Sequence, residues 1–257
     1  MQKHYYLVHF QYLGFRYHGW LKQPELRTVE HMVEKTLRFI LGHSRFKILA
    51  ASRTDARVSA NHSAFELFVH EPLDPNQLLT DFNLNLPSDI KVLKIEEKDK
   101  GFNIINGSKI KEYIYLFAFG EKYHPFCASL IASFLYDLDI ELMKAGAVLF
   151  QGRHTFVKYC TKPKPGATFE REILVSEITE NTIYRANFFP PVSYAYYIRS
   201  KGFLRYQVRL IMGQLLSLGR GEISLNDIEA SLKGSDNLPL RHIAPSSGLI
   251  LNDIEFD

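Results

Sequence analysis

The chain has 257 residues, and 46% of them are hydrophobic, which is enough for a sizeable core and argues against disorder. Its 31 lysines and arginines exceed its 28 aspartates and glutamates by only three, so net charge does not by itself identify a nucleic-acid-binding protein. Two cysteines argue against a disulfide framework, and neither the cysteines nor the ten histidines have the spacing of a zinc site, so no metal is expected.

The first hundred residues read as strands alternating with helices. Residues 4–12 alternate between apolar and polar side chains, as in a half-buried strand. Thr28 then caps a helix whose apolar side chains share one face before Gly42 ends it. The other elements expected in this half are strands at 46–50, 64–69 and 90–97 and a short helix near 75–82.

A second half begins near residue 105. Ser224 and Asp227 have the spacing of a capping box at the start of a helix. The elements expected here are strands at 109–119, 193–199 and 249–256, a hairpin at 173–188, and helices from Asp139 to about 150, at 203–218 and at 225–233. These patterns predict an α+β protein with two domains, residues 1–104 and residues 105–257.

The apolar runs of the chain are short. None approaches the ~18 residues that a membrane-spanning helix needs. The chain begins directly with strand-like residues rather than with a charged leader and an apolar core. We therefore expect a cytoplasmic protein with no membrane contact.

The segment Ala51–Ala60, A-S-R-T-D-A-R-V-S-A, places one carboxylate, Asp55, close to the cation Arg53. A lone aspartate is most often a turn or cap residue. This one falls in a loop between two expected strands, and catalytic groups are commonly placed on loops that a rigid scaffold holds. Asp55 is therefore a candidate catalytic residue.

This segment resembles the motif G-R-T-D-A-G-V-H of the tRNA pseudouridine synthase A family. The matching positions are Arg53, Thr54, Asp55, Ala56 and Val58. The departures are Ser52 and Arg57 in place of glycine and Ser59 in place of histidine. Five further blocks resemble the family's motifs and keep their order: Y-L-G-F-R-Y-H-G-W-L-K-Q-P from Tyr12, N-L-N-L-P from Asn83, K-E-Y-I-Y from Lys111, G-F-L-R-Y-Q-V-R-L-I-M-G from Gly202, and A-P-S-S-G-L-I-L from Ala244.

The resemblance implies a fold in which two mixed α/β halves share one extended antiparallel sheet, with helices on one side and a cleft between the halves. It implies an isomerase that converts uridine to pseudouridine in the anticodon stem-loop of tRNA, at tRNA positions 38, 39 and 40. It also implies a homodimer that needs no cofactor. The catalytic residues that it implies are Asp55, Tyr113 and Arg209.

The strand at 109–119 suits a nucleic acid on one of its faces. Alternation places Lys109, Lys111, Tyr113 and Tyr115 on that face, followed by two phenylalanines, and places the aliphatic residues on the other. Cations suit phosphates, and aromatic rings suit stacking on a base. We expect Tyr113 to stack on the uracil, with a half-buried sheet tyrosine as the alternative.

The remaining candidate residues fit the same reaction. A guanidinium from Arg209 can keep Asp55 ionised, lowering its pKa by about 1–3 units. Arg205 lies one turn earlier on the expected helix and would be a phosphate-facing or a solvated cation. The reacting uridine must leave its stack, and Arg53 is placed to fill the space or to bind the nucleotide's phosphate. Leu249, in the last motif block, is the remaining predicted substrate contact.

Two other functions stay open at this point. The first is a non-catalytic RNA-binding or RNA-folding protein on the same fold, with turnover lost through Arg57 and Ser59. The second is a protein-interaction module without an RNA partner, which leaves the lysines and rings of strand 109–119 unexplained. Basic residues recur near the motifs, among them Lys158, Lys162 and Lys164, and they favour RNA if they converge in space.

Overall fold

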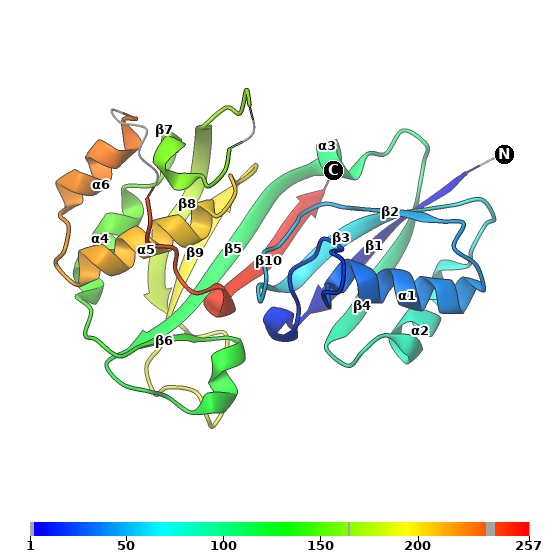
Figure 1. Ribbon diagram of the computed structural model, residues 1–257, viewed down its shortest axis with the longest axis horizontal. Coiled ribbons are helices and arrows are strands. Elements are labelled where there is room, and N and C mark those ends of the chain that lie inside the picture. Colours follow the sequence, from blue (N-terminus) through cyan, green and yellow to red (C-terminus); the bar gives the residue numbers. More distant parts are fainter. Residues whose placement is uncertain (1–2, 164, 235–239, 257) are drawn as a thin grey trace. The chain divides into compact units, whose positions relative to one another are not determined.

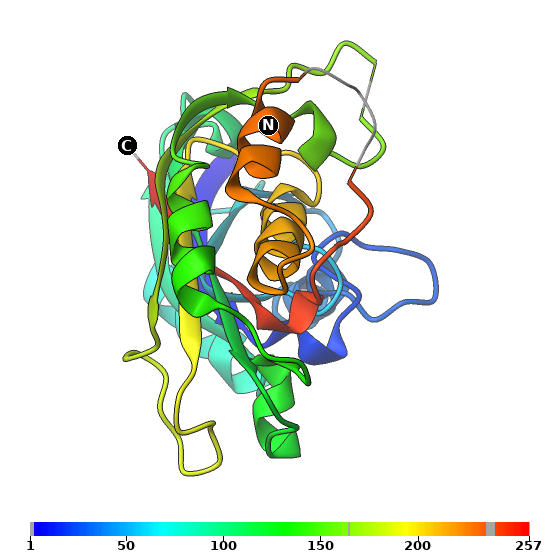
Figure 2. The same cartoon turned by 90° about the vertical axis from the view of Figure 1, so that its left-hand side faces the viewer.

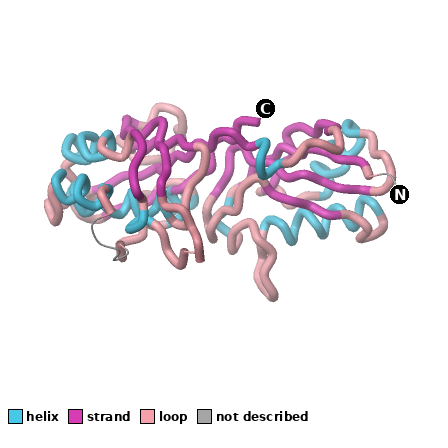
Figure 3. Tube along the Cα trace, turned by 90° about the horizontal axis from the view of Figure 1, so that it is seen from above, coloured by secondary structure: helices cyan, strands magenta, loops and turns pink. Residues whose placement is uncertain are grey.

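The computed structural model describes residues 3–163, 165–234 and 240–256 (Figure 1), so Lys164 lies outside the described residues. Within these residues the chain forms ten strands and six α-helices, and the predicted α+β fold is confirmed. The chain divides into unit 1, Met1–Lys109 with Leu251–Asp257, and unit 2, Ile110–Ile250. Strands and helices occur in both units (Figure 3).

Unit 1 is built on a sheet in the order β4-β1-β3-β10, with β2 also paired to β3. Strand β1 is antiparallel to both β3 and β4. The elements of this unit are β1 (His4–Tyr12), α1 (Val29–Leu41), β2 (Lys47–Ala50), β3 (Ser59–Val69), α2 (Pro75–Asn85), β4 (Ile90–Lys98), α3 (Ile104–Gly107), a 3-10 turn at Gly14–Arg16 and most of β10 (Leu249–Phe256).

Local sequence explains where the helices of unit 1 begin and end. Thr28 caps α1 by accepting a hydrogen bond from the His31 N–H, and Gly42 ends the helix with a φ of 68°. Helix α2 has the same kind of start, because Asp74 caps it and Pro75 occupies its first turn. The predicted start and end of α1 are therefore confirmed.

The core of unit 1 is rich in aromatic rings. Phe10 of β1 packs on Trp20 and on Phe65 of β3, with ring centres 5.2 and 5.4 Å apart. Phe65 in turn meets Phe82 of α2 edge to face. All four side chains are at most 2% exposed, so they attach α2 and the segment after β1 to the sheet.

A row of polar side chains crosses the strands of unit 1. His9 of β1 and His62 of β3 are joined through Nδ1 and Nε2, which lie 2.8 Å apart. His62 continues to Asp253 of β10, and His9 Nε2 lies 3.3 Å from the Glu96 carboxylate of β4. Burial and the neighbouring His62 lower the pKa of His9 to about 4, so this imidazole is neutral near pH 7.

The sheet of unit 2 has the strand order β5-β9-β8-β7, and β6 is parallel to β5. The elements of this unit are β5 (Ser108–Phe119), β6 (Ala132–Phe134), α4 (Ile140–Val148), β7 (Gly152–Thr155), β8 (Glu170–Glu180), β9 (Tyr194–Ser200), α5 (Gln207–Gly219), α6 (Leu225–Leu232) and 3-10 turns at Pro125–Ser129, Val157–Tyr159 and Ser246–Gly248. The predicted capping box of Ser224 and Asp227 opens α6.

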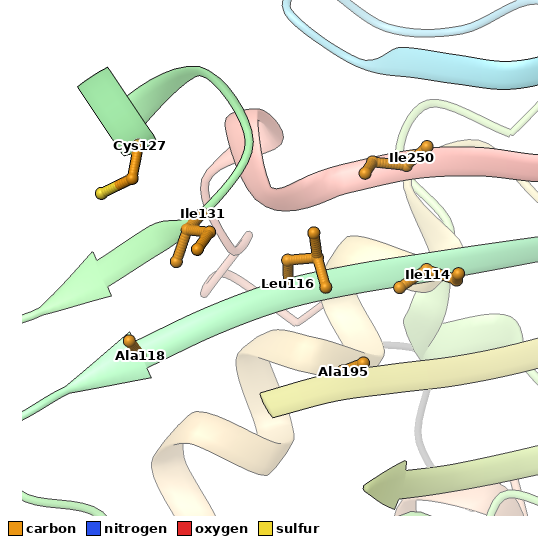
Figure 4. Close-up of a cluster of buried hydrophobic side chains, with 7 residues drawn as sticks. All are labelled: Ile114, Leu116, Ala118, Cys127, Ile131, Ala195 and Ile250. Carbon is orange, nitrogen blue, oxygen red and sulfur yellow. The ribbon is translucent and has the colours of Figure 1, made fainter. Parts of the chain in front are cut away.

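Both faces of β5 are buried in unit 2. On one face, Ile114 and Leu116 belong to an apolar cluster with Cys127, Ile131 and Ile250 (Figure 4). The cluster includes one of the two cysteines, which are both free and buried. Helices α4 and α5 run side by side within this unit (Figure 2).

Two expected elements of unit 2 differ in the structure. The predicted hairpin at 173–188 is wrong, because β8 pairs with β9 and residues 181–193 form the connection. Asn181 stabilises that connection: its side-chain amide donates to the Tyr184 carbonyl oxygen and to Ser193 Oγ. Helix α5 begins at Gln207 rather than near 203, because Tyr206 has a φ of 63°.

Candidate active site

Asp55 lies in the loop of residues 51–58 that joins β2 to β3. The loop closes in a β-turn, in which the Val58 N–H donates to the Asp55 carbonyl oxygen over 3.2 Å. Arg57, in the third position of this turn, has a φ of 66°, in the left-handed region that favours glycine. The turn thus fixes the main chain on the C-terminal side of Asp55, which is partly exposed.

The segment that follows β1 holds this loop through main-chain hydrogen bonds. The Trp20 N–H donates to the Thr54 carbonyl oxygen over 3.2 Å, and the Arg57 N–H donates to the Tyr17 carbonyl oxygen over 2.9 Å. Gly19 permits the approach, because its φ is 88° and a Cβ there would lie 2.6 Å from the Thr54 carbonyl oxygen. The two motif blocks that begin at Tyr12 and Ala51 therefore meet around Asp55.

Three buried hydroxyl groups add further contacts at the loop and its end. The hydroxyl oxygens of Tyr12 and Thr54 are 2.7 Å apart. Ser59 Oγ accepts a hydrogen bond from the Gly14 N–H over 2.9 Å, so the serine that replaces the family's histidine has a structural contact here. Sequence reasoning did not single out Tyr12, although its place at the start of a motif block was a usable signal.

Basic and aromatic residues surround the loop within unit 1. Arg53 is exposed. Tyr17 is buried, and its hydroxyl donates to Asp89 Oδ1 over 2.7 Å. Burial and this hydrogen bond raise the pKa of Tyr17 to about 12, so it stays a neutral phenol. The guanidinium carbon of Arg27 lies 5.1 Å from the centre of the Tyr17 ring.

Arg209 belongs to α5 in unit 2, and its side chain is fixed against the segment that precedes β10. Its Nε–H donates to the Ala244 carbonyl oxygen over 2.8 Å. The Ala244 N–H donates in return to the Arg209 carbonyl oxygen over 3.0 Å. The guanidinium carbon lies 5.1 Å from the centre of the Tyr206 ring. The last two motif blocks therefore pack together around Arg209.

Tyr113 lies on β5, beside the same motif blocks of unit 2. Its ring meets the Phe203 ring edge to face, with centres 5.3 Å apart. Tyr113 is 9% exposed, so an incoming base can touch only a small part of it. Phe203 belongs to the block that contains Arg209, and three motif blocks of unit 2 thus adjoin one another.

The expected stacking face of strand 109–119 is wrong for Tyr115 and Phe117. Both are fully buried, and the Tyr115 hydroxyl donates to the Pro245 carbonyl oxygen over 2.8 Å. Burial raises the pKa of Tyr115 far above its usual range. Alternation correctly placed these rings on one face, but that face is a second side of the core of unit 2.

The other predicted contact residues differ in exposure. Lys109 and Arg205 are exposed, whereas Lys111 is half-buried and burial lowers its pKa. Arg205 precedes α5 rather than lying on it, and its guanidinium carbon is 5.4 Å from the Tyr206 ring centre. Leu249 starts β10 and is 5% exposed. Their roles toward RNA stay predictions.

Comparison with known proteins agrees with the motif blocks. The profile of a family described as tRNA pseudouridine synthase matches residues 147–257. The tRNA pseudouridine synthase A 2 of Desulfotalea psychrophila is 32% identical over 263 residues, which cover 98% of this chain and 98% of that protein. The chain belongs to the tRNA pseudouridine synthase A family.

Two further relatives carry the same family name. The tRNA pseudouridine synthase A of Dictyoglomus thermophilum is 30% identical, over 97% of this chain and 98% of that protein. The tRNA pseudouridine synthase A of Thermodesulfovibrio yellowstonii is 28% identical, over 95% of this chain and 96% of that protein. The likeness thus includes both the Asp55 loop and the Arg209 helix.

Asp55 and Arg53 belong to unit 1, and Tyr113, Arg205 and Arg209 belong to unit 2. Among residues 3–163, 165–234 and 240–256, no three histidine, cysteine or acidic side chains are grouped as metal ligands. In the same part of the chain, no helix has the length and apolar character needed to cross a membrane.

Proposed function

We propose that this protein converts uridines of the tRNA anticodon stem-loop to pseudouridine, at tRNA positions 38, 39 and 40, with Asp55 as its catalytic carboxylate. The observation that carries the proposal is the Asp55 loop. The family motif that contains this carboxylate lies in the loop. One main-chain hydrogen bond from the Trp20 N–H and one to the Tyr17 carbonyl oxygen hold the loop in place. Such support gives a reacting group a fixed position, which is what catalysis of a demanding step requires.

The reaction is an isomerisation. The bond between ribose carbon 1 and uracil nitrogen 1 breaks, the base turns, and carbon 1 bonds to uracil carbon 5. The proton lost from carbon 5 is balanced by one gained at nitrogen 1, so no oxidant or reductant is consumed. Asp55 acts either as the nucleophile at the sugar or as the base on the neighbouring ribose proton.

The other residues have separate jobs in this proposal. Tyr113 meets the uracil with the small part of its ring that is exposed and accepts or relays the proton of carbon 5. Arg209 orients the Asp55 carboxylate and keeps it charged, and Arg53 binds the flipped nucleotide's phosphate or fills the space that it leaves. Lys109, Lys111, Arg205 and Leu249 contact the RNA around the reacting nucleotide.

The proposal is tested by a base-resolution pseudouridine assay on unmodified tRNA transcripts, with the protein alone and no added metal. We expect pseudouridine at one or more of positions 38, 39 and 40. Binding of the transcripts without any pseudouridine would contradict the proposal and favour the RNA-binding alternative. Modification confined to another arm of the tRNA would contradict the choice of target.

The role of Arg209 is tested by two matched substitutions. Arg209→Lys keeps the charge but loses the planar guanidinium, including the Nε–H that binds Ala244. We expect turnover to fall by about 100-fold with tRNA affinity little changed. Arg205→Lys is the control and should be mild, because Arg205 is exposed. Normal turnover in Arg209→Lys together with a defect in Arg205→Lys would contradict this assignment.

We also propose that the protein is a cytoplasmic homodimer, with each tRNA lying across both subunits. The family resemblance supports the homodimer. The cytoplasmic location of the tRNA substrate supports the location of the protein. Light scattering should give twice the monomer mass of 29.7 kDa. A fully active protein of 29.7 kDa would contradict the dimer.

A further inference from the structure

Arg57 holds a backbone conformation that side chains disfavour. Its φ of 66° puts it in the left-handed region, where an L-residue brings its Cβ too close to the following carbonyl oxygen. Glycine avoids this contact, and glycine is the residue of the resembled family motif at this position. The chain therefore has an arginine in place of the least strained residue, two positions after Asp55.

The strain at Arg57 is imposed by hydrogen bonds on both sides. The Arg57 N–H donates to the Tyr17 carbonyl oxygen, and the next N–H, that of Val58, donates to the Asp55 carbonyl oxygen. Relaxing φ would break one or both of these bonds. Strain that a structure maintains in this way concentrates at functional sites.

The Arg57 side chain lies at the surface beside an aromatic ring. It is exposed, and its guanidinium carbon lies 5.7 Å from the centre of the Phe15 ring. Phe15 is itself 39% exposed, so its ring lies at the surface beside the guanidinium. Within the described part of the chain Arg57 has no acidic partner, whereas the nearby Arg16 is paired with Asp89 over 2.7 Å. The charge of Arg57 is thus available to a ligand.

We propose that Arg57, supported by Phe15, binds an RNA phosphate next to the reacting uridine, and this inference rests on the proposed role of Asp55. Asp55 and Arg57 are two residues apart in the same β-turn, so their Cα atoms lie within about 7 Å of each other, and the long Arg57 side chain can reach a phosphate that flanks a ribose at Asp55. Its planar donors match two phosphate oxygens. Arg57 is therefore a substrate contact that strengthens the grip on RNA close to the reacting nucleotide.

Arg57→Gly separates binding from folding, because it removes the side chain and relieves the strain together. We expect a melting temperature about 2–4 °C higher than that of the wild type. We also expect about tenfold weaker binding of an unmodified anticodon stem-loop transcript, with a KM raised to match and kcat unchanged. The slope of log affinity against log salt should fall by about 0.7–0.9, the contribution of one phosphate contact.

Glu25→Gly is the matched control, since Glu25 is also exposed and has a φ of 59° in the same unit. It should raise the melting temperature similarly and leave affinity and salt slope as they are. Phe15→Leu should weaken binding less than Arg57→Gly does. If Arg57→Gly binds and turns over like the wild type, Arg57 is an ordinary solvated cation and the inference is overturned. A wild type that binds RNA without forming pseudouridine would instead contradict the proposed function and leave the binding comparison intact.

Discussion

The Asp55 loop and the Arg209 helix are held by different forces. The loop is fixed by a hydrogen bond from the Trp20 N–H, by one to the Tyr17 carbonyl oxygen and by the buried hydroxyl pair of Tyr12 and Thr54. Helix α5 is fixed by apolar packing, since 11 of its 13 residues are buried. Arg209 is thus attached to a nearly fully covered helix, whereas Asp55 depends on a small number of polar contacts.

This difference agrees with where the chain departs from the family motifs. Ser52, Arg57 and Ser59 all lie in or at the end of the Asp55 loop. A polar loop on the surface can accept new side chains that change its contacts, while a covered helix transmits every change to its neighbours.

The largest effect is expected from Gly213→Ala in the helix. A Cβ at Gly213 would lie 2.0 Å from the His242 carbonyl oxygen, so the segment bearing Ala244 must move away. We expect the free energy of unfolding to fall by about 3 kcal/mol or more, with loss of the Arg209–Ala244 hydrogen bonds. Urea denaturation measures this change. A loss below 1 kcal/mol would show that this packing is looser than the structure implies.

Gly19→Ala is the equivalent change at the Asp55 loop. The new Cβ would press on the Thr54 carbonyl oxygen and would also require alanine at a φ of 88°. We expect about 2–3 kcal/mol of destabilisation and a fall in kcat that exceeds any loss of folded protein, because Asp55 moves with Thr54. Steady-state kinetics at a temperature where the variant is folded separates the two effects. Unchanged kcat would contradict the view that this contact positions Asp55.

The polar row of unit 1 predicts a moderate sensitivity to acid. His9 is neutral in the folded state, with its pKa lowered to about 4, and protonates near pH 6.5 when unfolded. Stability should therefore fall as pH drops through this window, by about 2 kcal/mol between pH 7.5 and pH 5.

His9→Asn provides the control for the acid effect. It removes the titrating imidazole, so most of the dependence between pH 7.5 and pH 5 should disappear in urea titrations. His62, Glu96, Lys94 and Lys98 face the same imidazole and remain in this variant. An equally steep pH dependence in His9→Asn would assign the effect to one of those groups or to His242, whose pKa burial also lowers.

The smallest effect is expected from Tyr12→Phe. It removes one hydroxyl from the buried pair with Thr54 and should cost about 1 kcal/mol of unfolding free energy. Because Thr54 precedes Asp55, we also expect a modest fall in kcat with KM nearly constant. A change in KM alone would mean that this hydroxyl acts on substrate binding rather than on the position of the loop.

Features that local sequence determines were predicted well. The limits of α1 follow from Thr28 and Gly42, and both act as expected. The Asp55 loop was found between its strands because the flanking apolar runs mark them. Features that depend on distant parts of the chain were missed. The pairing of β8 with β9 across residues 181–193 is one example, since only the fold brings these strands together.

The site shows the same limit. Alternation along strand 109–119 gave the correct faces of β5, but it could not reveal that Tyr115 and Phe117 are covered within unit 2. The left-handed φ of Arg57 was equally hidden, because arginine carries no signal for that conformation. The motifs thus predicted which residues belong to the site. The exposure of those residues and the strain in the backbone could be seen only in the structure.

The most direct test of the account is Asp55→Asn, assayed for pseudouridine at base resolution on an unmodified tRNA transcript. The amide keeps the shape of the side chain but is neither a nucleophile nor a base. Loss of ~5 kcal/mol of transition-state stabilisation slows a chemical step by about four orders of magnitude, so no product should be detected while melting temperature and tRNA affinity stay near the wild type. Wild-type rates of pseudouridine formation in Asp55→Asn would contradict the catalytic role of this carboxylate.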